Sequence, residues 1–238
     1  MFNTGTKTNN KLIEAMFGAG VHYGYSKSRR HPSTSPFIFG AKNKVEIFDL
    51  EKTSKALEDS FNFVLSLGEK NKQILFVSGK KEAGSILRET AKNLGVSYVA
   101  GRWIGGTLTN FSEIRKRIQK FLDLQEKKEK GELSKYTKKE RLLIDRDIMD
   151  LESKFGGLMD MQELPSALFV IDSEQEKIAV TEAQKMGIPV ISISSSDCNI
   201  KGIDYPIPGN DSSLSSIKFF VSKIADAYKE GQKKSKLS

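Results

Sequence analysis

Two patterns of apolar and polar positions alternate along most of the chain. Short runs of apolar and β-branched residues, which are typical of strands, occur at 73–78, 96–100, 167–172 and 188–194, with shorter runs at 37–40, 45–48 and 204–208. Apolar residues three and four positions apart, which form one face of a helix, fill the stretches 50–70, 81–95, 173–187 and 212–231. Buried strands that alternate with helices indicate βαβ units and a parallel sheet covered on both faces.

The segment from Asn110 to Phe155 breaks this alternation, because it contains no strand pattern. Apolar residues recur at spacings of three and four in two arms, first at Phe111, Ile114, Ile118 and Phe121, then at Ile144, Ile148, Leu151 and Phe155. The residues TKKE at 137–140 form a capping box, which predicts the start of the second arm. Two antiparallel helices, each about 25–30 Å long at ~1.5 Å per residue, are therefore expected to project from the body.

These patterns predict three parts of the chain. Residues 1–106 and 157–230 form an α/β body, residues 107–156 form an inserted coiled-coil hairpin of helices, and residues 231–238 form a basic flexible tail. Within the body, residues 20–44 are expected to form a basic N-terminal loop.

Charge changes the picture by suggesting a partner. The 238 residues carry a net charge of +8, with a pI near 9.3, and the positive charge is concentrated in the first two thirds and in the tail. Such a balance favours an acidic partner, nucleic acid before an anionic membrane. The single cysteine, Cys198, excludes an intrachain disulfide and fits a reducing compartment. With neither a signal peptide nor an apolar run near the roughly 20 residues that span a bilayer, a soluble cytosolic protein is expected.

Catalysis is difficult to place in this sequence. It contains no G-x-S-x-G, H-E-x-x-H or C-x-x-C motif, and its two histidines lie nine residues apart in a loop-like stretch. No catalytic residue, metal ligand, cofactor or small-molecule substrate is therefore predicted. One enzyme alternative stays open, a nucleotide site at the carboxyl edge of the sheet built from Gly79, Lys80 and the pair Gly105-Gly106.

The stretch GVHYGYSKSRRHP at 20–32 suits RNA better than catalysis. Its cations can neutralise phosphates, Gly24 permits close approach of the backbone, and its aromatic rings can stack or donate hydrogen bonds. Partial burial of His22 and Tyr23 at the base of the loop is the structural alternative. For Trp103, a structural role where the hairpin meets the sheet is favoured. The predicted RNA-binding residues are His22, Tyr23, Gly24, Tyr25, Lys27, Arg29, Arg30, His31, Lys42, Lys44, Lys80, Lys81, Arg102, Arg115, Lys116 and Arg117.

Several phrases, in one unbroken order from about residue 12 to 230, resemble the bacterial-type small-subunit ribosomal protein S-two family. They include LIEAMFGAGVHYGY, GRWIGGTLTNF, FGGLMDMQELPSALFVID and GIDYPIPGNDSSLSSIKFF. The resemblance implies a three-layer flavodoxin-like α/β body with an inserted coiled-coil hairpin, and a structural, non-enzymatic role in the cytoplasm as part of the small ribosomal subunit. The implied partners are small-subunit rRNA, neighbouring small-subunit proteins and the mRNA-binding protein S-one.

The chain departs from the usual family text at three places. Tyr25 stands where the family has a second histidine, Cys198-Asn199 stands where it runs through Asp-Pro, and the C-terminus is short. The sequence leaves open whether the hairpin contacts rRNA or protein. It also leaves open a free RNA-binding regulator, which would differ only in where the protein sediments. The acidic balance of 165–228 favours a basic protein as the neighbour of that face.

Overall fold

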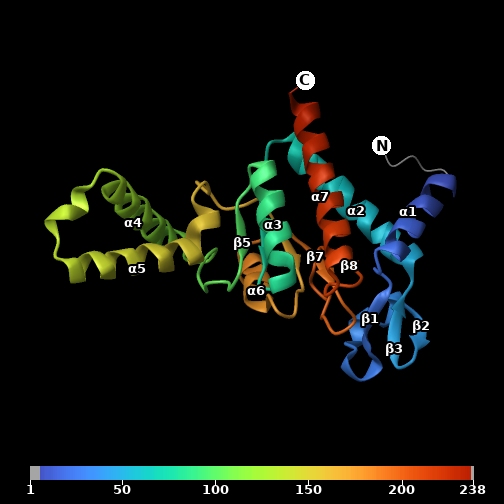
Figure 1. Cartoon of the computed structure of the whole chain (residues 1–238). Coiled ribbons are helices and arrows are strands. Elements are labelled where there is room, and N and C mark those ends of the chain that lie inside the picture. Colours follow the sequence, from blue (N-terminus) through green and yellow to red (C-terminus); the bar gives the residue numbers. More distant parts are fainter. Residues whose placement is uncertain (1–5, 237–238) are drawn as a thin grey trace.

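The centre of the molecule is a five-stranded parallel sheet. The computed structural model describes residues 6–236 (Figure 1). The strands of this sheet are β4 (Ile74–Ser78), β5 (Tyr98–Ala100), β6 (Ala167–Ile171), β7 (Val190–Ser194) and β8 (Tyr205–Pro208). They lie in the order β5-β4-β6-β7-β8, and every neighbouring pair is parallel. Counted along the chain, this is the flavodoxin-like order, so the predicted fold class is confirmed.

Helices cover both faces of the sheet and complete three layers. One face packs against α2, α3 and α7, around buried residues such as Phe169 and Phe220. The other face packs against α6 and the base of the helical hairpin, around Leu168 and Trp103. All residues of β4, β6 and β7 are buried, which explains their near-continuous apolar runs. The helices are α2 (Leu50–Glu69), α3 (Lys81–Leu94), α6 (Lys177–Lys185) and α7 (Leu214–Ser235).

The inserted helical hairpin projects away from the sheet, as Figure 1 shows. It consists of α4 (Phe111–Glu129) and α5 (Lys138–Phe155), joined by a 3-10 turn at Glu132–Lys135. Two salt bridges cross between the arms, Lys120–Asp147 at 2.8 Å and Lys128–Asp145 at 2.7 Å. Of the predicted apolar seam, Ile114, Ile118, Phe121, Ile148, Leu151 and Phe155 are buried, and Phe111 and Ile144 are partly buried.

The predicted capping box at the start of α5 is present. The Thr137 hydroxyl accepts from the Glu140 backbone N–H, and the Glu140 carboxylate accepts from the Thr137 N–H at 2.8 Å. We expect Thr137→Ala to speed hydrogen exchange of the amides at 138–141 about fivefold, because the helix start loses its cap. Exchange in α4 should stay unchanged and serves as the internal control. Equal exchange at 138–141 in both proteins would show that the cap does not limit fraying.

The N-terminal part has the two strands predicted near 37–40 and 45–48, and it has further regular structure where a loop was predicted. It contains α1 (Thr6–Gly18) and a three-stranded antiparallel sheet, in the order β1-β3-β2, formed by β1 (Tyr23–Ser26), β2 (Ile38–Lys42) and β3 (Val45–Phe48). Residues 20–44 therefore include two strands as well as 3-10 turns at Lys27–Arg29 and Pro32–Phe37. Strand β1, with the sequence YGYS, contains a glycine and a serine in place of a run of apolar residues, so it gives no strand pattern, and it is stabilised by pairing with β3.

The last helix is longer than the sequence predicted. Helix α7 continues to Ser235 and packs along α2, so most of the expected tail at 231–238 is helical. The two helices touch at Gly68 and Gly231, where a methyl group added to Gly68 would come within 2.5 Å of the Tyr228 carbonyl oxygen. In the described part of the chain, no helix has the length and apolar character needed to cross a membrane.

Candidate RNA interface

Exposed cations gather at one end of the three-stranded sheet. Ser26 of β1 and Lys42 of β2 both pair with Val45 of β3, so these three residues form one row across the sheet. Lys27 follows Ser26 in the chain, and Lys44 directly precedes Val45. Asn43 and Lys44 have φ values of 51° and 68°, the positive values that a tight two-residue hairpin turn requires. We call Lys27, Arg29, Lys42 and Lys44, all of them exposed, the N-terminal basic patch.

The support of this patch is fixed to the parallel sheet. Ser196, in the loop after β7, accepts at its hydroxyl from the Tyr25 N–H at 2.9 Å, and its carbonyl accepts from the His31 N–H at 2.8 Å and the Thr34 hydroxyl at 2.9 Å. A methyl group on Gly24 would lie 3.1 Å from the Ser196 hydroxyl oxygen. The glycine therefore serves packing within the protein, and the patch is held on a rigid base.

The two arginines of the segment have different surroundings. Arg29 is exposed, and its guanidinium carbon lies 5.0 Å from the ring centre of Tyr25, which places the cation over the aromatic face. Arg30 pairs at 3.2 Å with Glu46, whose side chain is only 1% exposed. Arg29 can face a ligand, whereas the charge of Arg30 is used to compensate a buried carboxylate.

Both histidines have structural surroundings. His22 is buried and stacked on Phe17 with ring centres 4.4 Å apart, and the ring centre of Tyr23 lies 4.1 Å from that of His22. Burial lowers the pKa of His22, so the ring is neutral near pH 7. His31 caps the 3-10 turn at Pro32–Phe37 by accepting from the Ser33 N–H. Tyr23 stays half-exposed, and the Tyr25 hydroxyl lies 2.8 Å from the Ser212 hydroxyl.

The remaining candidate cations do not join the basic patch. Figure 1 shows the hairpin and the three-stranded sheet at opposite ends of the molecule, so Arg115, Lys116 and Arg117 lie far from the patch. Arg115 ties the hairpin base together by donating to the Gln162 carbonyl at 2.7 Å, and Lys116 pairs with Glu113. Arg117 is exposed.

The candidates that follow β4 and β5 have contrasting environments. Lys81, the first residue of α3, is exposed. Arg102, in the loop after β5, is exposed as well. The Lys80 side chain is 10% exposed and forms salt bridges with Asp172 and Asp211, both at 2.9 Å. Lys80 therefore has partners inside the protein that the sequence pattern did not reveal.

Glu182 on α6 organises the glycine-rich loop, and sequence reasoning missed it. One carboxylate oxygen accepts from the Trp103 indole N–H at 3.1 Å and the Gly106 N–H at 2.7 Å. The other accepts from the Leu108 N–H at 3.0 Å and from both donors of Thr109 at 3.2 Å. Burial raises the pKa of Glu182, but these hydrogen bonds outweigh it and hold the pKa below the usual 4.5. Trp103 is 6% exposed, in agreement with the structural role favoured for it.

The crevice between β4 and β6, where a flavodoxin-like fold has its switch point, contains protein side chains. The Gly79 N–H donates to Glu176 at 2.7 Å, and a methyl group on Gly79 would lie 2.6 Å from that carboxylate. The Lys80 salt bridges lie at the same edge. Gly79 and Lys80, the residues invoked for a nucleotide site, are engaged within the protein.

Comparison with known proteins agrees with the phrases in the sequence. The family model described as Ribosomal protein S2 matches residues 16–231. The chain is 42% identical over 223 residues to the "Small ribosomal subunit protein uS2" of Geotalea uraniireducens (strain Rf4), covering 94% of this chain and 87% of that protein. It is 44% identical over 213 residues to the protein of the same name from Hahella chejuensis (strain KCTC 2396), with 90% and 84% covered. The corresponding protein of Pseudoalteromonas atlantica (strain T6c / ATCC BAA-1087) is 41% identical over 225 residues, with 94% and 93% covered. Since both the family model and the relatives span nearly the whole chain, this chain belongs to the ribosomal protein S2 family.

Proposed function

We propose that the chain is a structural constituent of the small ribosomal subunit that binds small-subunit rRNA through the N-terminal basic patch. The observation that carries the proposal is the convergence of four exposed cations at one end of a sheet that is itself fixed to the body. Cations on a rigid surface gain affinity by neutralising phosphates and releasing counterions, and RNA helices are recognised largely by shape and backbone. Tyr25 beneath Arg29 adds a flat surface beside the patch.

Lys81, Arg102 and Arg117 extend the proposal to separate contacts elsewhere on the molecule. All three are exposed, but they lie outside the basic patch. Lys80, Arg30 and Arg115 contribute to stability through their internal partners. The enzyme alternative is set aside because the family is one of ribosomal proteins and because Gly79 and Lys80 contact the protein's own side chains.

Replacing Arg29 with alanine is expected to weaken binding to a small-subunit rRNA transcript. The slope of log affinity against log salt should become shallower by roughly 0.7–0.9, the contribution of one phosphate contact. Thermal stability should not change, since Arg29 is exposed. Filter binding over a salt series measures the slope, and calorimetry measures the melting temperature.

Two further variants make this test specific. Lys185→Ala removes an exposed charge from α6 and should leave the slope unchanged. Arg30→Ala should instead lower the melting temperature, because Glu46 is left buried without its cation. If Arg29→Ala and Lys185→Ala have the same slope as the parent protein, Arg29 is not a phosphate contact.

Neighbouring proteins form the second part of the proposal, and protein S-one is the candidate implied by the resemblance. The hairpin exposes apolar side chains on α5, at Leu142, Leu143 and Met149, among mixed charges. A surface with this mixture of apolar and charged side chains can contact a neighbouring protein or RNA. Crosslinking of assembled subunits, with lysines of α4 and α5 as donors, should identify peptides of other proteins, whereas crosslinks mainly to rRNA would reject this part.

Sedimentation tests the proposal as a whole. The tagged protein in its native lysate should migrate with the small subunit at low and high salt and should co-purify with its rRNA in stoichiometric amount. Migration as a free protein without RNA would overturn the proposal. Migration with RNA other than rRNA would favour a free RNA-binding regulator.

A further inference from the structure

Tyr25 connects the body of the protein to the exposed guanidinium of Arg29. Its backbone N–H donates to the Ser196 hydroxyl at 2.9 Å, which ties the residue to the loop after β7. Its own hydroxyl lies 2.8 Å from the Ser212 hydroxyl, in the loop after β8. The guanidinium carbon of Arg29 lies 5.0 Å from the centre of the same ring. One aromatic side chain therefore joins two loops of the body to a cation of the N-terminal basic patch.

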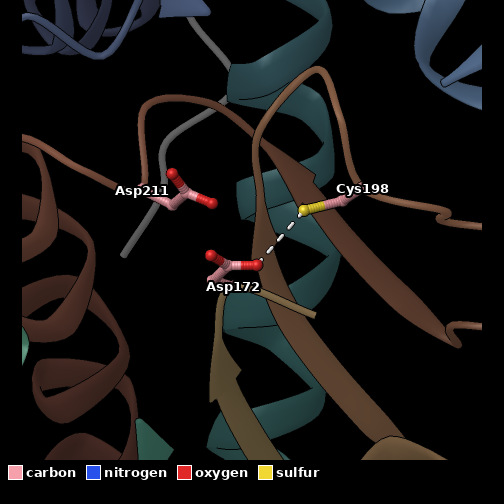
Figure 2. A group of neighbouring side chains, drawn as sticks. All are labelled: Asp172, Cys198 and Asp211. Atoms are coloured by element: carbon pink, nitrogen blue, oxygen red, sulfur yellow. Dashed lines mark hydrogen bonds between the residues drawn. The ribbon is translucent and has the colours of Figure 1, made fainter. Parts of the chain in front are cut away.

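The Tyr25 hydroxyl is anchored through Ser212 to a buried ion pair. Ser212 donates its only hydroxyl proton to Asp211 at 3.0 Å, because an ionised carboxylate can only accept. Ser212 is then left to accept from Tyr25, which sets the direction of the contact between the two hydroxyls. Figure 2 shows Asp211 near Asp172, and the Lys80 ammonium lies 2.9 Å from both carboxylates. The ring is thus held by groups that are fixed inside the body.

The Arg29 side chain has few restraints other than this ring. Among residues 6–236 it forms no salt bridge and no side-chain hydrogen bond, and the charge of Asp197 acts on it only from beyond salt-bridge distance. A free arginine side chain has many rotamers, and a contact with a phosphate requires that one of them be selected. A ring that already restrains the guanidinium lowers this ordering cost, which otherwise weakens binding. Stacking on the ring leaves the N–H groups at the edge of the guanidinium plane available to a phosphate.

We propose that Tyr25 is a positioning residue, which holds the Arg29 guanidinium ready for an RNA phosphate and does not bind the RNA itself. This inference rests on the proposed function, because it takes Arg29 to be a phosphate contact. A positioning residue lowers the ordering cost of the contact but does not change the number of phosphates that the protein neutralises. Loss of the ring should therefore weaken binding by the same factor at every salt concentration, whereas loss of Arg29 makes the salt slope shallower.

A double-mutant cycle tests the dependence of Tyr25 on Arg29, with filter binding of the full-length protein to a small-subunit rRNA transcript. Tyr25→Leu should weaken binding about two- to fivefold, the size of a cation–π contact at an exposed site, and should keep the salt slope of the parent protein. Tyr25→Leu added to Arg29→Ala should cause no further loss, because the ring then has no guanidinium to hold. Added to Lys185→Ala, which removes an exposed charge from α6, it should cause the full loss.

Tyr25→Phe keeps the ring and should recover most of the affinity that Tyr25→Leu loses. If Tyr25→Leu does not fold, Tyr25→Phe and Ser212→Ala take its place, since both remove the same hydroxyl contact. Their small losses should then be equal and should disappear in Arg29→Ala. A loss of the same size with and without Arg29, or no loss in any of these variants, would overturn the positioning role, while the proposed function would still stand on the shallower slope of Arg29→Ala. A parent-like affinity and slope in Arg29→Ala would instead remove the phosphate contact, and the positioning role with it.

Discussion

Replacement of Glu182 by alanine is expected to lower the free energy of unfolding by about 3–5 kcal/mol. Its carboxylate accepts from donors in the loop that connects β5 to the hairpin, and two of these, the Trp103 indole and the Leu108 backbone N–H, are buried. Each buried donor left without an acceptor costs roughly 1–3 kcal/mol. The Gly106 and Thr109 donors add less, because they can turn to water.

Urea unfolding measures this loss, and Glu152→Ala is its control because Glu152 is exposed on α5. A loss in Glu182→Ala no larger than in Glu152→Ala would show that the loop does not depend on the carboxylate. Tryptophan fluorescence gives a local readout, since Trp103 is the only tryptophan. Its emission should shift to the red in the folded variant.

Acid should remove the stabilisation that the Glu182 carboxylate provides. The pKa of Glu182 is lower in the folded protein than the usual 4.5, so its stabilisation is complete above pH 4.5 and is lost as the pH falls through the folded value. The stability difference between the parent protein and Glu182→Gln should therefore shrink below pH 4.5. A difference that stays constant to lower pH would contradict the hydrogen-bonded carboxylate.

Lys80→Met is expected to be comparably destabilising, by about 3–5 kcal/mol at neutral pH. Asp211 is fully buried, and the Asp172 side chain is 13% exposed, so loss of the ammonium leaves two neighbouring carboxylates without their cation. Burial lowers the pKa of Lys80, but Asp211 and Asp172 outweigh it and raise the pKa above 10.5. The ammonium side of this contribution is therefore present below pH 10.5 and is lost as the pH rises through the folded pKa of Lys80, whereas the part that depends on the Asp211 carboxylate is also lost in acid.

Lys81→Met is the matched control, since Lys81 is the exposed neighbour in the sequence. It should change stability by less than about 0.5 kcal/mol. Thermal unfolding at pH 7.5 and pH 5.5 completes the test. The loss in Lys80→Met should be smaller at pH 5.5, because the Asp211 carboxyl, with a pKa of about 6 even beside Lys80, then becomes protonated. Equal stabilities of the two lysine variants would contradict a buried salt bridge.

Local patterns were sufficient for much of the fold. The apolar runs at β4, β6 and β7 and the capping box at Thr137 depend on neighbours in sequence. These elements and their order along the chain could therefore be predicted. Strand β1 could not be predicted, because its sequence YGYS has no run of apolar residues and the strand depends on pairing with β3. The extension of α7 to Ser235 likewise depends on packing against α2, which overrides the polar composition of the segment.

The candidate interface was predictable only as far as charge and exposure coincide. Lys27, Arg29, Lys42 and Lys44 are exposed, as cations usually are. Nothing near Lys80 in the sequence shows that Asp172 and Asp211 will reach it, and nothing near Glu182 shows that a distant loop will surround it. Such partners are brought together by the order of the parallel strands, which is a property of the whole fold.

Helix α7 leaves a translating ribosome after every strand of the parallel sheet, yet it covers α2, which leaves before all of them. Until α7 emerges, the α2 side chains Leu57, Phe61 and Val64 have no complete cover on the nascent chain. Apolar faces exposed during synthesis favour aggregation and binding by chaperones. A member of a ribosomal protein family thus has a body that closes only after α7 has itself left a ribosome.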